Sequence, residues 1–365
     1  MRDAAPHIDA LEGLRRTLGE ARAGVALALT IVITAAGCTQ SRDANHGRAG
    51  RAYAGTVTID GSSTMQPLAQ RVADAFRQQH PDITVTVGRS DTGPGLAKLC
   101  AGAVDMAAAS RPINAAEIGD CSAMGIEFVE LPVAFDSLSV IVSSRNTFVD
   151  CLSVSELRRM WEPAAQGRVA RWNQIRAGFP ARPVRLVGPG GEAGTFDYFT
   201  LAVVGEQGSS RTDYTRIEDY DALAQAVGDD PNALGFVGYA YYAAHKDALK
   251  LVGIDGGSGC VVPSGETVAE NTYRPLARPM FLYVNGDAAR RTEVRALAHA
   301  FVAPERSRDV TAAGYMALPV ATLLSAARRL DDGVTGSLFG GRGAVLGLTA
   351  DVLQDEDKIK SALVR

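Results

Sequence analysis

One arrangement of residues recurs three times along this chain and restricts its fold more than any other feature. A short apolar or β-branched run leads into a loop rich in Gly, Ser and Thr, and the loop leads into a helical pattern, at 56–66, 83–96 and 184–197. Strands that alternate with helices predict an α/β fold with a mixed or parallel sheet. No longer internal period is present, which argues against a solenoid.

The spacing of apolar residues predicts the remaining elements. Strands are expected at 56–59, 83–87, 104–108, 139–142, 184–187, 234–238 and 280–284. Helices are expected at 66–79, 96–103, 154–161, 196–204, 220–227, 239–246, 292–302 and 321–330. Ser153 and Glu156 form the pattern of a capping box at one helix start. Residues 331–365 are expected to form a surface tail with a short helix near 349–362.

The three loops predict an anion site. Each one presents unpaired backbone N–H groups and the positive end of a helix dipole, and these hold anions without many charged side chains. The alternative for any single loop is an ordinary N-cap, a position where Ser and Thr are common. Arg111 is expected to supply the one full positive charge, because a guanidinium suits a tetrahedral oxyanion. The other candidate donors are Ser63, Thr64, Thr92, Gly93, Ser110, Gly194 and Thr195.

Several other functions have no support in the sequence. The P-loop pattern, the dinucleotide fingerprint, G-x-S-x-G and H-E-x-x-H are all missing, and no nucleophile with a neighbouring base is evident. Lys plus Arg number 37 against 41 Asp plus Glu, which gives a formal net charge of −4, and aromatic residues make up 6%. This balance disfavours a nucleic-acid partner.

The N-terminal region predicts export. Residues 23–36 form an apolar run that suits a signal peptide and is short for a membrane-spanning helix. The run ends in small residues followed by Cys38, which resembles a lipobox, so residues 1–37 are interpreted as a lipoprotein signal peptide and Cys38 as the lipidated residue. The alternative is a plain signal peptide cut near Ala36. Residues 38–54 are expected to form a polar tether.

The remaining cysteines agree with an oxidising compartment, where pairing is expected. Cys100, Cys121, Cys151 and Cys260 allow three connectivities, and their spacing does not choose among them. Metal binding by these cysteines is disfavoured, because the chain has no C-x-x-C pair and its five His are scattered.

Several short motifs occur together in a specific order between about residues 55 and 320. They are Asp-Gly-Ser-Ser-Thr at 60–64, Ala-Ser-Arg-Pro-Ile at 109–113, Met-Trp-Glu-Pro at 160–163 with Trp-Asn at 172–173, Gly-Pro-Gly at 188–190 with Gly-Thr-Phe-Asp-Tyr-Phe at 194–199, Arg-Thr-Asp-Tyr-Thr at 211–215, Leu-Gly-Phe-Val-Gly-Tyr-Ala-Tyr-Tyr at 234–242, and Tyr-Arg-Pro-Leu at 273–276. In these motifs the chain resembles the phosphate-binding proteins of bacterial phosphate ABC importers, the PstS family, in their lipoprotein form.

The resemblance implies a type II periplasmic-binding-protein fold, in which two α/β lobes are joined by two hinge segments. Lobe one is expected at 55–134 plus 280–330 and lobe two at 135–279, with crossings near 131–140 and 273–284. This division places Cys100 with Cys121 and Cys151 with Cys260. We predict those pairs, because either crossed pairing would tie the lobes together and oppose hinge closure.

The resemblance also implies a function. The chain is expected to capture inorganic phosphate between its lobes and deliver it to ABC permease subunits, as an extracytoplasmic monomer anchored by a lipid, without cofactor or metal and without enzymatic activity. The family's ligand contacts map onto the candidate donors, with Glu192 and Ala193 standing where relatives often carry Asp and Ser. Ala193 keeps a backbone N–H for the ligand. Glu192, or else Asp91, is expected to be a buried carboxylate that accepts the proton of phosphate and repels sulfate.

Two other functions stay open at this point. One is binding of a different small oxyanion, such as molybdate, or of a phosphonate. The other is a secreted phosphatase-like enzyme on the same lobes, which would need a nucleophile beside a base or a metal cluster.

Overall fold

The structure is a computed structural model that describes residues 54–350 and 352–363. The predicted signal peptide at 1–37, Cys38 and nearly all of the tether at 38–54 lie outside the described residues. In the described part of the chain, no helix has the length and apolar character that a membrane crossing requires.

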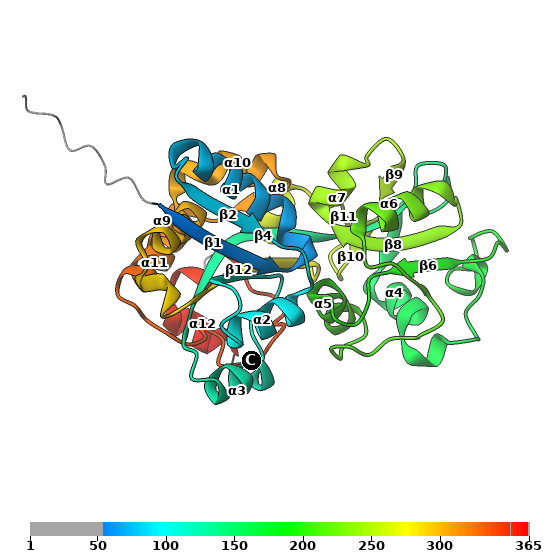
Figure 1. The fold of residues 1–365 in the computed structure, drawn as a ribbon. Helices are drawn as coiled ribbons and strands as arrows, with labels where there is room; N and C mark the ends of the chain where they lie inside the picture. Colours follow the sequence, from blue (N-terminus) through cyan, green and yellow to red (C-terminus); the bar gives the residue numbers. More distant parts are fainter. Residues whose placement is uncertain (1–53, 351, 364–365) are drawn as a thin grey trace, which may run out of the picture. The chain divides into compact units, whose positions relative to one another are not determined.

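A ten-stranded mixed sheet organises the fold and confirms the predicted α/β class. Its main order is β2-β1-β3-β12-β4-β8-β6-β7, with β9 and β13 pairing to β4. The strands are β1 Gly55–Gly61, β2 Ile83–Val87, β3 Met106–Ala109, β4 Phe128–Ser143, β6 Arg185–Gly188, β7 Thr215–Arg216, β8 Ala233–Gly238, β9 Leu249–Leu251, β12 Ala277–Asn285 and β13 Met316–Ala317. In Figure 1 the blue and orange elements gather around β1 and β12, whereas green elements surround β8 and β6.

Strand β4 joins the two halves of this sheet. Its first part pairs antiparallel with β12, from Phe128 to Ser137, and its last part pairs antiparallel with β8, from Leu138 to Val142. Every residue of β4 is buried. Strands β4 and β12 run through most of the ranges 131–140 and 273–284, where the two crossings are predicted, and they are paired neighbours in this sheet. The predicted strand at 139–142 is only the end of β4.

The helices follow the apolar pattern closely. The predicted ranges 66–79, 154–161 and 292–302 match the observed helices, and the capping box between Ser153 and Glu156 is formed. Helix α3 was missed, because only one of its nine residues is buried and its apolar spacing is weak. The α-helices are α1 Gln66–Gln79, α2 Thr92–Cys100, α3 Ala115–Ala123, α4 Val154–Trp161, α5 Gly194–Val203, α6 Tyr220–Asp229, α7 Tyr239–Ala244, α8 Gly265–Ala269, α9 Thr292–Val302, α10 Ser307–Ala312, α11 Val320–Asp331 and α12 Glu356–Leu363.

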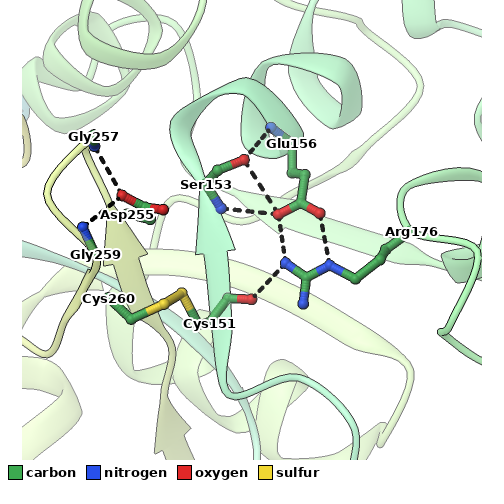
Figure 2. The surroundings of a disulfide bond; sticks show 8 residues. All are labelled: Cys151, Ser153, Glu156, Arg176, Asp255, Gly257, Gly259 and Cys260. Atoms are coloured by element: carbon green, nitrogen blue, oxygen red, sulfur yellow. Dashed lines mark hydrogen bonds and ion pairs between the residues drawn. A yellow bond between two sulfur atoms is a disulfide. The ribbon is translucent and has the colours of Figure 1, made fainter.

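Both predicted disulfides are present. Cys100–Cys121 joins the end of α2 to α3, and Cys151–Cys260 closes a separation of 109 residues. The second bond links the outer strands of a small sheet with the order β11-β10-β5, made of β5 Cys151–Ser153, β10 Gly253–Asp255 and β11 Cys260–Val261. Figure 2 shows this bond beside the ion pair between Glu156 and Arg176. Neither disulfide joins the two halves of the large sheet.

The C-terminal residues are packed and do not form the surface tail that was predicted. Phe339, Leu353 and Ile359 are buried in the main apolar core. The predicted short helix is present as α12. Leu353 and Ile359 line a cavity together with Pro132 of β4, and Phe339 packs edge-on against Phe281 of β12.

Glu130 fixes the C-terminal segment to β4. Its carboxylate is fully buried and accepts hydrogen bonds from the Ser337 hydroxyl at 3.0 Å, the Leu338 amide at 2.8 Å and the Tyr283 hydroxyl at 2.7 Å. Burial raises the pKa of Glu130 to about 7, and these three donors lower it only in part.

This raised pKa predicts a pH-dependent stability. A folded pKa above the unfolded value of 4.5 contributes stability that is present at low pH and is lost as pH rises through about 7. The free energy of unfolding should therefore fall by roughly 3 kcal/mol from this group between pH 4.5 and 8. Urea titrations at several pH values measure it, with Glu130→Gln as the comparison. The variant should show a flatter profile, and parallel profiles would contradict the assignment to Glu130.

Candidate ligand-binding site

The three loops predicted to bind an anion lead into helix starts that lack side-chain caps. The first loop leads into a short 3-10 turn, η1 Ser63–Met65, and the others lead into α2 and α5. No side-chain cap bond forms at their N-cap residues Ser62, Asp91 and Ala193. By contrast, Asn114 and Ser153 cap α3 and α4 in the usual way. Ordinary capping therefore does not explain the composition of these three loops.

Hydroxyl groups from the three loops meet in the interior. The Thr64 and Thr195 hydroxyls lie 2.6 Å apart, and the Thr92 and Ser110 hydroxyls lie 3.2 Å apart. Gly194 packs directly on the second pair, since a Cβ placed there would lie 2.5 Å from each of these two oxygens. All five residues are buried. The structure thus brings together residues up to 131 positions apart in sequence.

Ser63, Gly93 and Glu192 lie at the edge of this cluster. The Ser63 hydroxyl donates to Asp91 Oδ1 at 2.7 Å, so the side chain at the N-cap position of α2 binds a neighbouring loop and not its own helix. A Cβ on Gly93 would lie 3.7 Å from Glu192 Oε2. Asp91, Glu218 and Asp219 form an acidic rim around a shallow pocket of about 300 Å³ that Ser63 and Arg89 also line, and Glu192 lies beside Asp91 at its edge.

Two expectations about the third loop are wrong. Glu192 is exposed and not a buried carboxylate. It lies close to Asp91 on the same rim, and burying a second like charge beside that group would be costly. The Ala193 amide, expected to serve the ligand, donates to the Gly190 carbonyl at 3.2 Å, because the loop closes as a tight turn before α5.

Arg111 is buried and held by two carboxylates. Its Nε donates to Asp197 Oδ2 at 2.7 Å, and its two terminal nitrogens donate to Glu117 at 2.8 and 2.9 Å. Burial opposes the charge, yet the hydrogen bonds to Glu117 and the charge of Asp197 raise the pKa of Arg111 above its ordinary value. Because Asp197 and Glu117 already balance its charge, Arg111 adds little net positive charge to the site and serves mainly to orient the groups around it.

A second buried cation was missed by the sequence analysis. Arg278 of β12 is fully buried and donates to the Thr195 hydroxyl at 2.8 Å, to the Gly194 carbonyl at 3.1 Å and to Asp136 Oδ2 at 3.1 Å. Burial raises the pKa of Asp136, and Arg278 lowers it in part. The prediction that Arg111 is the one positive charge of the site is therefore wrong. The available signal in the sequence was one charged residue inside each of two apolar segments, Asp136 in 131–140 and Arg278 in 277–284.

Tyr220 was also missed and lies at the same place. Its hydroxyl is buried next to the hydroxyls of Thr64 and Thr195, which are near enough to lower its pKa in part, but among the described residues it makes no hydrogen bond of good geometry. Burial raises its pKa to about 12. An unpaired buried hydroxyl usually has a functional reason, and here it faces the hydroxyl cluster as a further donor.

The cluster is closed by contacts between the two halves of the large sheet. Arg89 of the second loop forms an ion pair with Asp219 at the start of α6, at 3.0 Å. The Tyr241 hydroxyl donates to the Ser63 carbonyl at 2.6 Å. These contacts hold the helix starts against one another and keep the hydroxyl cluster away from solvent.

The next question is whether the described residues include a set of side chains that could hold a metal ion. Among the described residues, no group of three or more His, Cys, Asp or Glu side chains is placed to hold a metal ion. Donors of hydrogen bonds dominate the buried cluster, which suits an anion.

Comparison with known proteins agrees with this geometry. The sequence profile of the PBP superfamily domain matches residues 46–303. The chain belongs to this superfamily. Protein SphX of Synechocystis sp. is 40% identical to this PBP superfamily member over 294 residues, which cover 80% of the chain and 87% of SphX. The phosphate-binding protein PstS of Staphylococcus aureus is 30% identical over 308 residues, which cover 84% and 89%.

A solved structure extends the comparison. A possible phosphate binding protein from Planctomyces limnophilus is 37% identical, with a TM-score of 0.58, and the match covers 77% of this chain and 99% of that one. The resemblance to the PstS family and the predicted fold class are confirmed by these matches.

Proposed function

We propose that this chain captures inorganic phosphate between its two lobes and delivers it to an ABC permease. One observation carries the proposal: three helix starts without side-chain caps converge on a buried cluster of hydroxyls. Even Asp91, a residue type that often caps helices, accepts a hydrogen bond from Ser63 and does not cap its own helix. Such an arrangement stabilises an anion with fixed donors. Two relatives, the phosphate-binding protein PstS and the possible phosphate binding protein from Planctomyces limnophilus, support phosphate as that anion.

The ligand would displace the hydroxyl pairs that now close the cluster. The amides of Thr64, Thr92, Gly194 and Thr195 and the hydroxyls of the three threonines would donate to its oxygens, with the hydroxyls of Ser63 and Ser110 and the amide of Gly93 beside them. Arg278 fixes the Thr195 hydroxyl and adds a positive charge in a region without solvent, where charge-assisted bonds are strong. Arg111 fixes Asp197 in the first turn of α5 and so orients the helix start.

Discrimination against sulfate needs an acceptor for the proton that phosphate keeps at neutral pH. We assign this role to Asp91 and not to Glu192, because Asp91 is partly buried beside Ser63 whereas Glu192 is exposed. Burial raises the pKa of Asp91, with further increases from Glu218 and Glu192. A carboxylate that holds a proton more tightly is a better acceptor and repels a fully ionised oxyanion.

This assignment predicts a selectivity change. Asp91→Asn should reduce the preference for phosphate over sulfate at least tenfold, roughly the effect of one hydrogen bond to a charged group. Competition calorimetry measures the ratio of the two affinities, and Glu192→Gln is the matched control, expected to change the ratio less than twofold. A large effect of Glu192→Gln with an unchanged ratio for Asp91→Asn would reverse the assignment.

The proposal extends to the whole protein. Residues 1–37 would be a lipoprotein signal peptide, Cys38 the lipid anchor and 38–54 the tether, which places the folded part outside the cytoplasm. The lobes would be 55–134 plus 280–330 and 135–279, in a monomer that binds and releases its ligand without catalysing a reaction. A chromogenic phosphate ester tests the last point, since turnover by the pure protein with added metal would favour a phosphatase-like function.

Calorimetry with four anions tests the proposed function itself. Phosphate and arsenate should bind with similar affinities, whereas sulfate and molybdate should bind much more weakly or not at all. Tight binding of molybdate or of a phosphonate without binding of phosphate would assign the site to a different anion.

A further inference from the structure

The charge of this chain is unevenly distributed, and one segment carries a large positive excess. Residues 154–185 contain seven arginines and two glutamates, a formal net charge of +5 in a chain whose net charge is −4. All seven arginines are exposed. They are Arg158, Arg159, Arg168, Arg171, Arg176, Arg182 and Arg185. None of them contacts the buried hydroxyl cluster, so ligand binding does not explain this charge.

The connection between α4 and β6, visible in Figure 1, carries most of these arginines on a fixed frame. Its centre is a short 3-10 turn, η3 Trp172–Gln174. Trp172 is fully buried and packs edge-on against Phe148 and Phe179. The Trp172 amide donates to the Arg182 carbonyl at 3.0 Å, which holds Arg182 beside Arg171. The motifs at 160–163 and 172–173, which serve no part of the ligand cluster, form the base of this frame.

Three of the seven guanidinium groups are paired with carboxylates within the chain. Arg176 is held by Glu156 at 2.7 Å, as Figure 2 shows. Arg158 and Arg185 make longer contacts of 3.4 Å to acidic groups. Among the described residues, the other four have no carboxylate partner. We call these four, Arg159, Arg168, Arg171 and Arg182, the arginine surface.

We propose that the arginine surface docks onto an acidic surface of a protein partner, which under the proposed function is the permease. Arg159 and Arg171 donate to the carbonyls of Gln174 and Ala181, so their side chains are already ordered before a partner binds. Ordered guanidinium groups on a rigid frame lose little entropy when they meet carboxylates at fixed positions. A layer of anionic lipid would attract the same charge without needing this frame.

Charge reversal at two positions tests the proposal, which rests on the proposed function. The side chains of Arg168 and Arg182 are exposed and make no hydrogen bond or ion pair among the described residues, so Arg168→Glu with Arg182→Glu should leave the fold intact. The matched control reverses Arg308 and Arg328, two exposed arginines outside this segment whose side chains likewise make no hydrogen bond or ion pair within the described part of the chain. Each variant replaces the native protein in cells, where uptake of radiolabelled phosphate is measured, and calorimetry measures phosphate affinity on the purified proteins.

We expect the arginine-surface variant to lower uptake at least fivefold at saturating phosphate, with phosphate affinity unchanged, and the control variant to keep full uptake. Full uptake by the arginine-surface variant would overturn the docking proposal alone. A wild-type protein that does not bind phosphate would instead contradict the proposed function.

Two further measurements separate the other partners. Arg168→Lys with Arg182→Lys keeps the charge but removes the planar guanidinium groups that bind carboxylates with two hydrogen bonds, so docking on a protein should weaken with this variant too. Full uptake by the lysine variant, together with charge-dependent binding of the wild-type protein to phosphatidylglycerol vesicles, would assign the surface to the membrane and overturn the proposal. Sedimentation velocity that shows a dimer lost on charge reversal would assign it to a second copy and likewise overturn it.

Discussion

Gly194→Ala should weaken phosphate binding about a hundredfold while the protein still folds. The added Cβ would lie 2.5 Å from the hydroxyl oxygens of both Thr92 and Ser110, which come from the other half of the large sheet. Overpacking at such a contact costs up to about 3 kcal/mol, which corresponds to roughly a hundredfold in affinity. Under the proposed function this cost falls on the closed, ligand-bound state, in which these groups must lie together. Calorimetry with phosphate measures the loss.

Gly191 provides a matched control in the same loop. A Cβ on Gly191 would meet no atom within 4 Å, so Gly191→Ala should keep the wild-type affinity. Thermal unfolding of both variants without ligand checks that the fold is retained. Equal affinities for the two alanine variants would show that the approach of Gly194 to the hydroxyls is not needed for binding.

Arg278→Met should be the most destabilising single change in the site. The substitution leaves Asp136 buried without its partner, and breaking a buried ion pair in this way costs about 3–5 kcal/mol. Both side chains are fully buried, so solvent cannot compensate. Urea unfolding measures the loss. Phosphate binding should fall as well, because the Thr195 hydroxyl and the Gly194 carbonyl lose the group that holds them.

A double variant separates the two consequences. Combining Arg278→Met with Asp136→Asn removes both charges and should restore most of the stability. Phosphate affinity should stay roughly ten- to hundredfold below the wild-type value, since the loss of a charge-assisted hydrogen bond is not restored. Recovery of both properties together would show that Arg278 serves only the fold.

The local elements of this fold could be predicted from the sequence, because apolar spacing and loop composition are local signals. Helix α1 and strand β2 have the expected limits, and the two disulfides followed once the lobes were assigned from the resemblance. The three anion-type loops were recognised for the same reason: each one is a short stretch of small residues before a helix.

The long-range pairs of the site could not be predicted. Arg278 and Asp136 are 142 positions apart and lie in separate apolar segments, where a single charged residue does not reveal its partner. Tyr220 had the sequence pattern of an ordinary helix start. Glu192 was expected to be buried because it stands where relatives of the PstS family often carry Asp, but the burial of a carboxylate depends on the neighbouring charges that only the fold brings close.

Backbone amide shifts on titration with phosphate test the central claim most directly. In the ¹⁵N-labelled protein, phosphate should shift the amide proton signals of Thr64, Gly93, Gly194 and Thr195 strongly downfield. The dissociation constant from these shifts should equal the one measured by calorimetry. The amide of Ala193 should move less, because it is already bonded to Gly190. Saturable phosphate binding that leaves these four amides unchanged would show that the anion is held elsewhere and would contradict the account.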